Sequence, residues 1–153
     1  MPPSEQPTTA VGPVVVGIDG SEGSLVALRV AADEARRRGA TLEVVVVWHP
    51  GVVGSLPVFG VGTPVDAQLE ELRRGLADTL ADEGLADGNP EVRERVVNGH
   101  AAEVLVEASG SAALVVVGTR GHGGLAGKML GSVSQQVVAH ARCPVMVVPH
   151  SST

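Results

Sequence analysis

Aromatic residues and cysteine are nearly absent from this chain of 153 residues. Phe, Trp and Tyr make up 1% of the chain, whereas hydrophobic residues as a whole make up 44%, so a core must be built from Val, Leu, Ala and a little Ile. The single cysteine, Cys143, excludes a disulfide framework and points to a reducing compartment. A chain of this length is expected to fold as one domain.

Two further absences narrow the class of protein. The net charge is −6, and no clustered basic surface is available to neutralise a phosphate backbone, which argues against a general nucleic-acid binder. No apolar stretch approaches the roughly 20 residues that span a bilayer, and the N-terminus lacks a basic region followed by a hydrophobic segment. The sequence therefore predicts a cytoplasmic protein whose partners include neither nucleic acid nor a membrane.

Short apolar runs alternate regularly with longer amphipathic segments. Residues 1–13, rich in Pro, Thr and Ser, are expected to form a disordered tail, followed by a single domain over 14–149 and a short tail over 150–153. Strands are predicted over residues 14–18, 42–48, 92–97, 113–117 and 145–148. Three of these runs are nearly continuous Val and Leu, as in parallel strands that are buried on both faces. The run 92–97 alternates with charge and indicates an edge strand.

The segments between these runs have the apolar spacing of helices. Leu25, Leu28, Ala32 and Ala35 share one stripe, which Gly39 is expected to end. Three further stripes are found at positions 65, 69, 72, 76 and 80, at 104, 105 and 108, and at 133, 137 and 141. The pattern predicts an α/β fold, with a five-stranded parallel sheet, helices on both faces and right-handed crossovers. The Rossmann-like order 3-2-1-4-5 is compatible with it.

In that order the loops after the first and fourth strands meet, at the place where doubly wound sheets bind ligands. Gly118 and Gly121 follow the fourth apolar run, and Gly131 and Ser132 precede the last helix. Glycine N–H groups and a helix start are suited to holding phosphate. Ser132 is expected at the N-cap, with its hydroxyl and the N–H groups of Val133 and Ser134 facing phosphate oxygens. The alternative is that Ser132 only caps the helix and the glycines only form turns.

Asp19, at the end of the first strand, is the acidic residue that this arrangement places near the site. Its carboxylate could accept from a ribose hydroxyl or an adenine amino group, or it could only tie down the turn into the first helix. Contact with the ligand is the favoured interpretation, because the loop faces the expected crevice. Val47, at the end of the second strand, could contribute an apolar contact to a base.

Two common phosphate motifs do not explain the glycine-rich stretch. A P-loop is excluded because Gly127-Lys128 is followed by Met129, where Ser or Thr is needed, and His122 stands where the first glycine belongs. A relaxed dinucleotide fingerprint begins at Gly121, but it follows the fourth strand, and no acidic residue about 20 positions later could bind a ribose. That second match is treated as accidental.

The spacing Gly118-x2-Gly121-x9-Gly131-Ser132 resembles the nucleotide-binding signature of the universal stress protein family. The resemblance runs from residue 14 to residue 149 and includes the opening Val-Val-Val-Gly-Ile-Asp-Gly-Ser. It implies an ATP-binding, stress-associated protein with sheet order 3-2-1-4-5, in which Asp19 contacts adenosine and Val47 contacts adenine through its backbone. It also implies a homodimer paired through the last strand, formed here by Val145, Met146, Val147 and Val148.

The candidate nucleotide-binding set follows from the loops and from this resemblance. It consists of Gly17, Asp19, Val47, Gly118, Thr119, Arg120, Gly121, His122, Gly123, Gly131, Ser132, Val133 and Ser134. Lys128 could add charge near the triphosphate or point to water. The glycine-rich segment 50–63 could form a flap over the base or a plain surface loop.

Three functions remain open from the sequence. The favoured one is a binding module, a nucleotide-dependent regulator in stress response that holds ATP without efficient turnover. A slow ATP hydrolase would need an oriented water and usually a metal such as Mg²⁺, yet Asp19 is the one acid clearly placed near the site. The five histidines show no paired metal spacing. An AMP or cyclic-nucleotide binder is the third, although the full glycine and serine set favours ATP.

Overall fold

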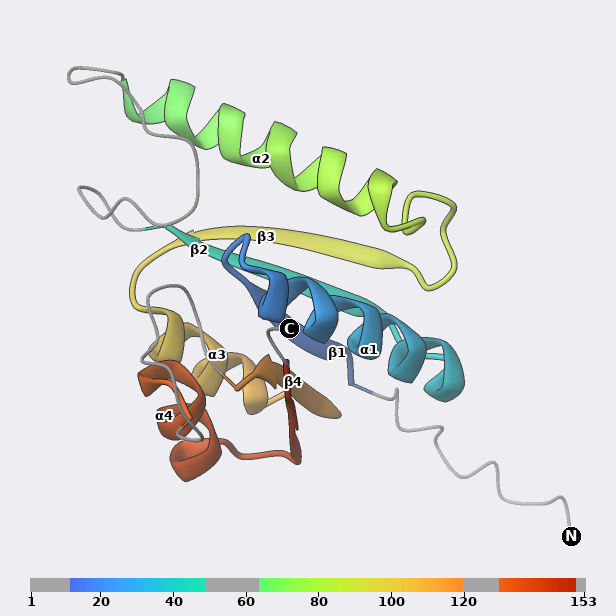
Figure 1. The fold of residues 1–153 in the computed structure, drawn as a ribbon, viewed down its shortest axis with the longest axis vertical. Coiled ribbons are helices and arrows are strands. Elements are labelled where there is room, and N and C mark those ends of the chain that lie inside the picture. The colour runs from blue at the N-terminus through green and yellow to red at the C-terminus, as the bar shows by residue number, and fades with distance from the viewer. Residues whose placement is uncertain (1–11, 49–63, 120–129, 151–153) are drawn as a thin grey trace, which may run out of the picture.

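The computed structural model describes residues 12–48, 64–119 and 130–150. Strands and helices alternate throughout these ranges (Figure 1). The strands are β1 (Val14–Ile18), β2 (Leu42–Trp48), β3 (Val92–Asn98), β4 (Leu114–Gly118) and β5 (Val145–Val148). The helices are α1 (Glu22–Arg38), α2 (Val65–Asp82), α3 (Ala101–Ser109) and α4 (Ser132–His140).

The five strands form one parallel sheet in the order β3-β2-β1-β4-β5, which confirms the expected topology. Val14 of β1 lies opposite Leu42 of β2 and Leu114 of β4, so the three central strands start in register. Because β1 has neighbours reached from opposite directions along the chain, the connections after β1 and β4 diverge at the carboxyl end of the sheet.

The bounds of the elements differ from the sequence prediction by one residue in two strands. β3 continues to Asn98, and β4 begins at Leu114 and includes Gly118. Residues 1–11 of the expected tail, and 151–153 at the other end, lie outside the described residues. Pro13, the last residue of the expected tail, already accepts a hydrogen bond from the N–H of Ala113 at 2.9 Å, so attachment to the fold begins one residue before β1.

Helix α1 is delimited by local signals that the sequence carries. The Ser21 hydroxyl accepts from the N–H of Ser24 and caps the N-terminus, and Glu22 lies in the first turn. Three arginines, residues 36–38, occupy the last turn, where positive charge is favourable. Gly39 ends the helix with φ of 61°, a left-handed conformation that glycine adopts without a Cβ penalty.

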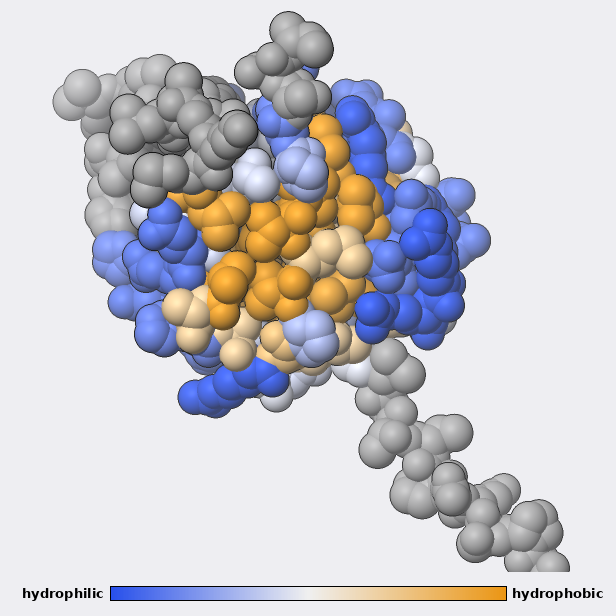
Figure 2. Space-filling view, turned by 60° about the horizontal axis from the view of Figure 1, so that its bottom comes forward, coloured by the Kyte–Doolittle hydropathy of each residue, from blue (hydrophilic) through white to orange (hydrophobic). Residues whose placement is uncertain are grey.

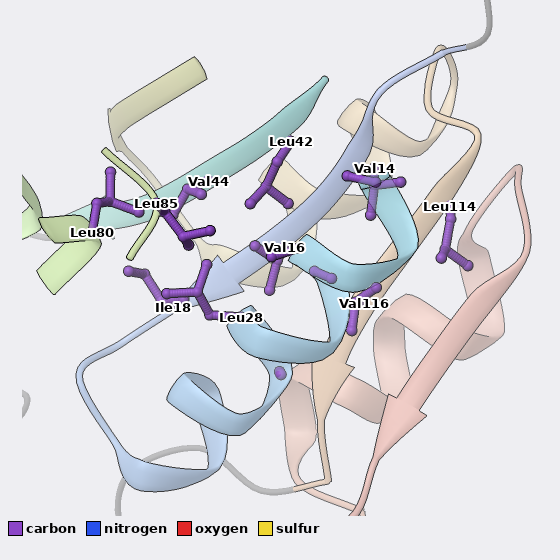
Figure 3. Packing of buried hydrophobic residues seen from close by; sticks show 14 of the residues in the cluster. Val14, Val16, Ile18, Leu28, Leu42, Val44, Leu80, Leu85, Leu114 and Val116 are labelled. Atoms are coloured by element: carbon purple, nitrogen blue, oxygen red, sulfur yellow. The ribbon is translucent and has the colours of Figure 1, made fainter. Parts of the chain in front are cut away.

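The sheet separates two cores of different size. On one face, α1 and α2 pack over the strands and bury alternate strand residues, among them Val16, Ile18 and Val44, with Leu28 and Leu80 (Figure 3). On the other face, α3 and α4 lie together (Figure 1) and pack with the intervening strand residues around Val15, Val45, Leu105, Val115 and Val137. Alternation along each strand therefore assigns successive valines to different cores.

The two edge strands have opposite character. β3 carries Arg93 and Arg95 on one face, where the Arg95 guanidinium lies 2.8 Å from the carboxylate of Glu43, which is 8% exposed on β2. This edge agrees with the charged edge strand that the sequence predicts. β5 carries no charge, and Val145, Met146 and Val147 are half-buried. Among the described residues, no helix is long and apolar enough to cross a bilayer.

Candidate functional site

A cavity lies at the carboxyl end of β1 and β4, on the side of the sheet that α3 and α4 cover. Residues from six helices and strands line it, which is the arrangement expected at the switch point of a doubly wound sheet. The lining residues are Gly17, Ile18, Asp19, Ser21 and Ser24, with Val45 and Val47, Ala101 and Leu105, Val117 and Gly118, and Val133 and Ser134.

The turn from β1 into α1 forms a hydrogen-bonded rim of the cavity. Oδ1 of Asp19 accepts from the N–H of Ser21 at 2.9 Å and from its hydroxyl at 2.6 Å. The Ser24 hydroxyl accepts from the N–H of Asp19 at 3.3 Å and donates to the carbonyl of Ser21 at 2.9 Å. Asp19 therefore performs the structural role weighed in the sequence, and it does so while lining the cavity.

An apolar wall faces this polar rim. Val45 and Val47 contribute it from β2, and Ala101 and Leu105 from the start of α3. The packing of Leu105 explains why residue 17 is a glycine, because a Cβ at residue 17 would lie 2.9 Å from the Leu105 Cδ1. This glycine, next to the carboxyl end of β1, lets the α3 side chain approach the strand and close the inner end of the cavity. A flat apolar wall beside a polar rim suits a ligand with one apolar ring face and several hydrogen-bonding groups.

Helix α4 begins one residue earlier than the sequence predicts. The N-cap is Gly131, with φ of −66° and ψ of 166°, and Ser132 is the first helical residue, without a capping hydrogen bond from its side chain. The prediction that Ser132 caps the helix is therefore wrong. The first intrahelical bond runs from the N–H of Gln135 to the carbonyl of Gly131 at 2.9 Å, so the N–H groups of residues 132–134 have no acceptor within the helix.

The carbonyl of Thr119 fixes the position of that helix start. It accepts from the N–H of Gly131 at 2.7 Å and from the Ser134 hydroxyl at 3.0 Å, while the N–H of Thr119 donates to the carbonyl of Val148 at 3.1 Å. The backbone of Thr119 and the N–H of Gly131 are thus engaged within the protein. The physical reason is that β4, β5 and α4 converge here, and backbone groups brought together without water must pair.

The candidate residues from the sequence divide into three groups. Six line the cavity: Gly17, Asp19, Val47, Gly118, Val133 and Ser134. Thr119, Gly131 and Ser132 lie next to them at the junction of β4 and α4. Arg120, Gly121, His122 and Gly123 lie outside the described residues, as do Lys128 and the segment 50–63.

Sequence reasoning did not name seven of the lining residues. They are Ile18, Ser21, Ser24, Val45, Ala101, Leu105 and Val117. Ser21 was signalled by the Asp-Gly-Ser turn, because such turns hold their side chains close to the backbone. Ala101 and Leu105 carried no signal, since nothing in an apolar helical stripe tells which residue faces a cavity.

Metal-binding chemistry is weakly represented near the site. The described residues contain no group of three His, Cys, Asp or Glu side chains that could hold a metal ion. His150 lies with its Nε2 3.5 Å from a carboxylate oxygen of Glu22, at the start of α1. His49 and His122 lie outside the described residues.

The fold and the cavity define a doubly wound α/β protein with a ligand crevice at the switch point of its sheet. The model of the Universal stress protein family matches residues 11–149, and the chain belongs to that family. It is 45% identical over 141 residues to Universal stress protein Rv2005c of Mycobacterium tuberculosis, covering 91% of this chain and 46% of that protein. The chain thus spans about half the length of the curated relatives that it matches.

Two solved structures of the family were described with nucleotides. A universal stress protein in complex with cAMP is 30% identical, with a TM-score of 0.65, covering 94% of this chain and 100% of that one. The universal stress protein from Archaeoglobus fulgidus in complex with dAMP is 26% identical, with a TM-score of 0.62, covering 90% of this chain and 98% of that one.

Proposed function

We propose that the chain binds ATP in the cavity at the ends of β1 and β4 and acts as a nucleotide-dependent regulator in the stress response. The observation that carries the proposal is the meeting of three kinds of group in one cavity. Asp19 lies on the polar rim, Val45 and Val47 form the apolar wall, and Val133 and Ser134 lie in the first turn of α4. Similar proteins were solved with cAMP and with dAMP, which supports an adenine nucleotide as the ligand.

Each part of the cavity suits one part of the nucleotide. The apolar wall of Val45, Val47 and Leu105 offers van der Waals contact to an adenine ring. The Asp19 carboxylate can accept from ribose hydroxyls in addition to its bonds to Ser21. The N–H groups at the start of α4 and the positive end of that helix's dipole favour phosphate oxygens. Because Gly131 donates to Thr119, we assign the phosphate contacts to the N–H groups of residues 132–134.

ATP held in this way can serve as a switch. ATP differs from AMP by two phosphates, which would reach the start of α4. A ligand alters a conformation only through a difference in affinity between two states. We therefore propose that the phosphate end of the cavity makes the contacts that differ between the two conformations of the switch. An AMP or cyclic-nucleotide binder and a slow ATP hydrolase that uses Mg²⁺ are the alternatives, and both use the same cavity.

Direct identification of the ligand tests the proposal. Mass spectrometry of small molecules released by denaturing the purified protein should detect an adenine nucleotide, and calorimetry should rank ATP above AMP and cAMP. Ala101→Leu places a larger side chain in the cavity and should weaken ATP binding at least tenfold. Ala139→Leu, on the exposed face of α4, is the matched control and should bind as the parent does.

Several outcomes would contradict the proposal or select an alternative. Release of no adenine nucleotide, together with no measurable ATP affinity, would refute nucleotide binding. Equal ATP affinity in the parent and in Ser132→Ala, with unchanged affinity in Ala101→Leu, would place the site elsewhere. Tighter binding of AMP or cAMP than of ATP would favour an AMP or cyclic-nucleotide binder. Steady ADP release that is lost in Asp19→Ala would favour an enzyme.

We further propose that two chains pair through β5, as expected from the sequence. β5 lies at the edge of the sheet, and Figure 2, which faces that edge, shows an apolar surface bordered by hydrophilic residues. An uncharged edge strand exposes backbone donors and acceptors that a second strand can satisfy. Light scattering should find a dimer, which Val147→Arg should shift to monomer. Val65→Arg, at a half-exposed position on α2, is the control. A monomeric parent would refute this proposal.

The cellular setting belongs to the same proposal. A nucleotide switch of this kind would act in the cytoplasm, where ATP is available and where Cys143 would remain a free thiol. Fractionation of the native organism, with the protein detected by antibody, tests this location. Recovery in the membrane or extracellular fraction would contradict it.

A further inference from the structure

A second cavity lies on the opposite face of the sheet from the nucleotide site. It is bounded by the ends of β1 and β2 on one side and by the middle of α2 on the other, with a volume of about 250 Å³. Its floor consists of Ile18, Val46, Leu72 and Leu76, which are all buried. We call it the α1–α2 groove, since Leu25 of α1 closes one side. Ile18 lines both this groove and the first cavity.

The rim of the groove on α2 has an unusual composition. Glu71, Gly75 and Thr79 lie four residues apart and therefore follow one line along the helix. A glycine inside a helix is less favourable than an alanine, because it loses more backbone freedom on folding. Gly75 does not have the positive φ found at five other described glycines, and a Cβ built on it meets nothing within 4 Å. Neither backbone conformation nor close packing requires glycine here, so its effect is to leave the groove open.

The polar groups on this rim are acceptors. The Thr79 hydroxyl donates to the carbonyl of Gly75 at 2.9 Å, which leaves its oxygen lone pairs to accept. The Glu71 carboxylate makes no ion pair with another residue of the described ranges. Arg29, one turn beyond Leu25 on α1, is held by both carboxylate oxygens of Glu83, at 2.6 and 2.9 Å. The groove therefore presents an apolar floor beneath a negative rim.

We propose that the α1–α2 groove binds a small molecule with an apolar body and a cationic head. The apolar body would lie on Ile18, Val46 and Leu76, and the head would lie beside the carboxylate of Glu71, one turn from Gly75. The size is adequate, because a dry apolar cavity of about 150 Å³ accommodates benzene. Neutralisation of an ammonium group by a carboxylate selects an amine over an acid of the same shape.

The test uses 2-phenylethylamine as the probe and 3-phenylpropanoate as its anionic counterpart. In a titration of the isotopically labelled full chain, followed by NMR, the amine should give saturable shifts of the Ile18, Gly20 and Gly75 amides. The acid should bind at least fivefold more weakly. Gly75→Leu fills the groove and should remove the saturable shifts, while Ala77→Leu, on the exposed face of α2, should leave them unchanged.

Charge and location are tested by three further variants. Glu71→Gln should bring the affinities of the amine and the acid together, whereas Glu70→Gln, which changes the net charge equally at an exposed position, should not. Ala101→Leu, in the first cavity, should leave amine binding unchanged. Absence of saturable shifts in the parent would overturn the proposal, as would shifts that persist in folded Gly75→Leu. Equal loss in Glu70→Gln and Glu71→Gln would overturn the role of Glu71.

Discussion

The two faces of the sheet carry similar apolar residues but pack them into cores of different size. The face under α1 and α2 holds the larger core and buries Leu28 of α1, a helix that is capped at both ends. The face under α3 and α4 holds a smaller core and leaves a cavity beside Leu105, at the end where β1 and β4 diverge. We therefore assign most of the stability to the first face and the proposed nucleotide binding to the second. The predictions below test this separation, in order of decreasing effect.

Leu28→Ala should give the largest loss of stability. Leu28 is fully buried between α1 and the sheet, so truncation removes buried methyl groups and leaves a cavity that the tightly packed face cannot close. The free energy of unfolding should fall by about 4 kcal/mol, measured by urea denaturation. The folded variant should keep the nucleotide affinity of the parent. A loss below about 1 kcal/mol would mean that this face does not dominate stability.

Leu105→Ala should affect both stability and binding. Leu105 already borders a cavity, so it has fewer contacts to lose, and the free energy of unfolding should fall by about 2 kcal/mol. Because the side chain forms the apolar wall and packs on Gly17, ATP affinity should also change severalfold. Denaturation and calorimetry on one sample measure both. Unchanged affinity would separate α3 from the site and weaken the comparison of the two faces.

The ion pair between Arg29 and Glu83 should make a small, pH-dependent contribution on the first face. The hydrogen bond from Arg29 lowers the pKa of Glu83 below its ordinary value of 4.5. A carboxylate with a lowered pKa stabilises the fold above its unfolded pKa, and this stabilisation is lost as the pH falls through the folded value. Glu83→Gln should therefore unfold at lower urea concentration than the parent at pH 7, and the difference should shrink below pH 4.5. A difference independent of pH would contradict this assignment.

Cys143 should react slowly on the second face. Burial raises the pKa of the Cys143 thiol, and the side chain packs against the core around Val137. The thiolate is the reactive form, so alkylation at pH 7.5 should be slower than that of free glutathione and should accelerate with rising pH. Timed mass spectrometry with iodoacetamide measures the rate. A rate equal to that of glutathione would mean that the core opens readily around this residue.

Much of the fold could be predicted because its signals are local. Short apolar runs separated by amphipathic segments predicted the positions of all five strands. The apolar stripe from Leu25 to Ala35, followed by Gly39, predicted the position of α1. The charge on β3 identified one edge of the sheet, and the order of the strands agreed with the expectation. Half of the candidate site could be predicted for the same reason, since Asp19 and Gly118 stand at strand ends, which a parallel sheet brings together.

The remaining features depend on contacts that no local pattern encodes. Ser132 carries the residue type of an N-cap, yet Gly131 occupies that position, because its N–H is drawn to the carbonyl of Thr119 at 2.7 Å. Ala101 enters the cavity because α3 begins directly above the sheet end. Both outcomes follow from the geometry in which β4, β5 and the helices meet.

The sequence by itself determined the strands and the helices, was compatible with the order of the sheet, and carried the resemblance to the family to which the chain belongs. These depend on periodicity and on glycine spacing, which are properties of the chain read in order. The tertiary structure alone decided which N–H groups at α4 are already engaged, that Leu105 packs on Gly17, and that a second groove opens beside Gly75. The physical reason is that these hydrogen bonds and packing contacts join segments far apart in the sequence, and they form only when folding packs those segments against one another.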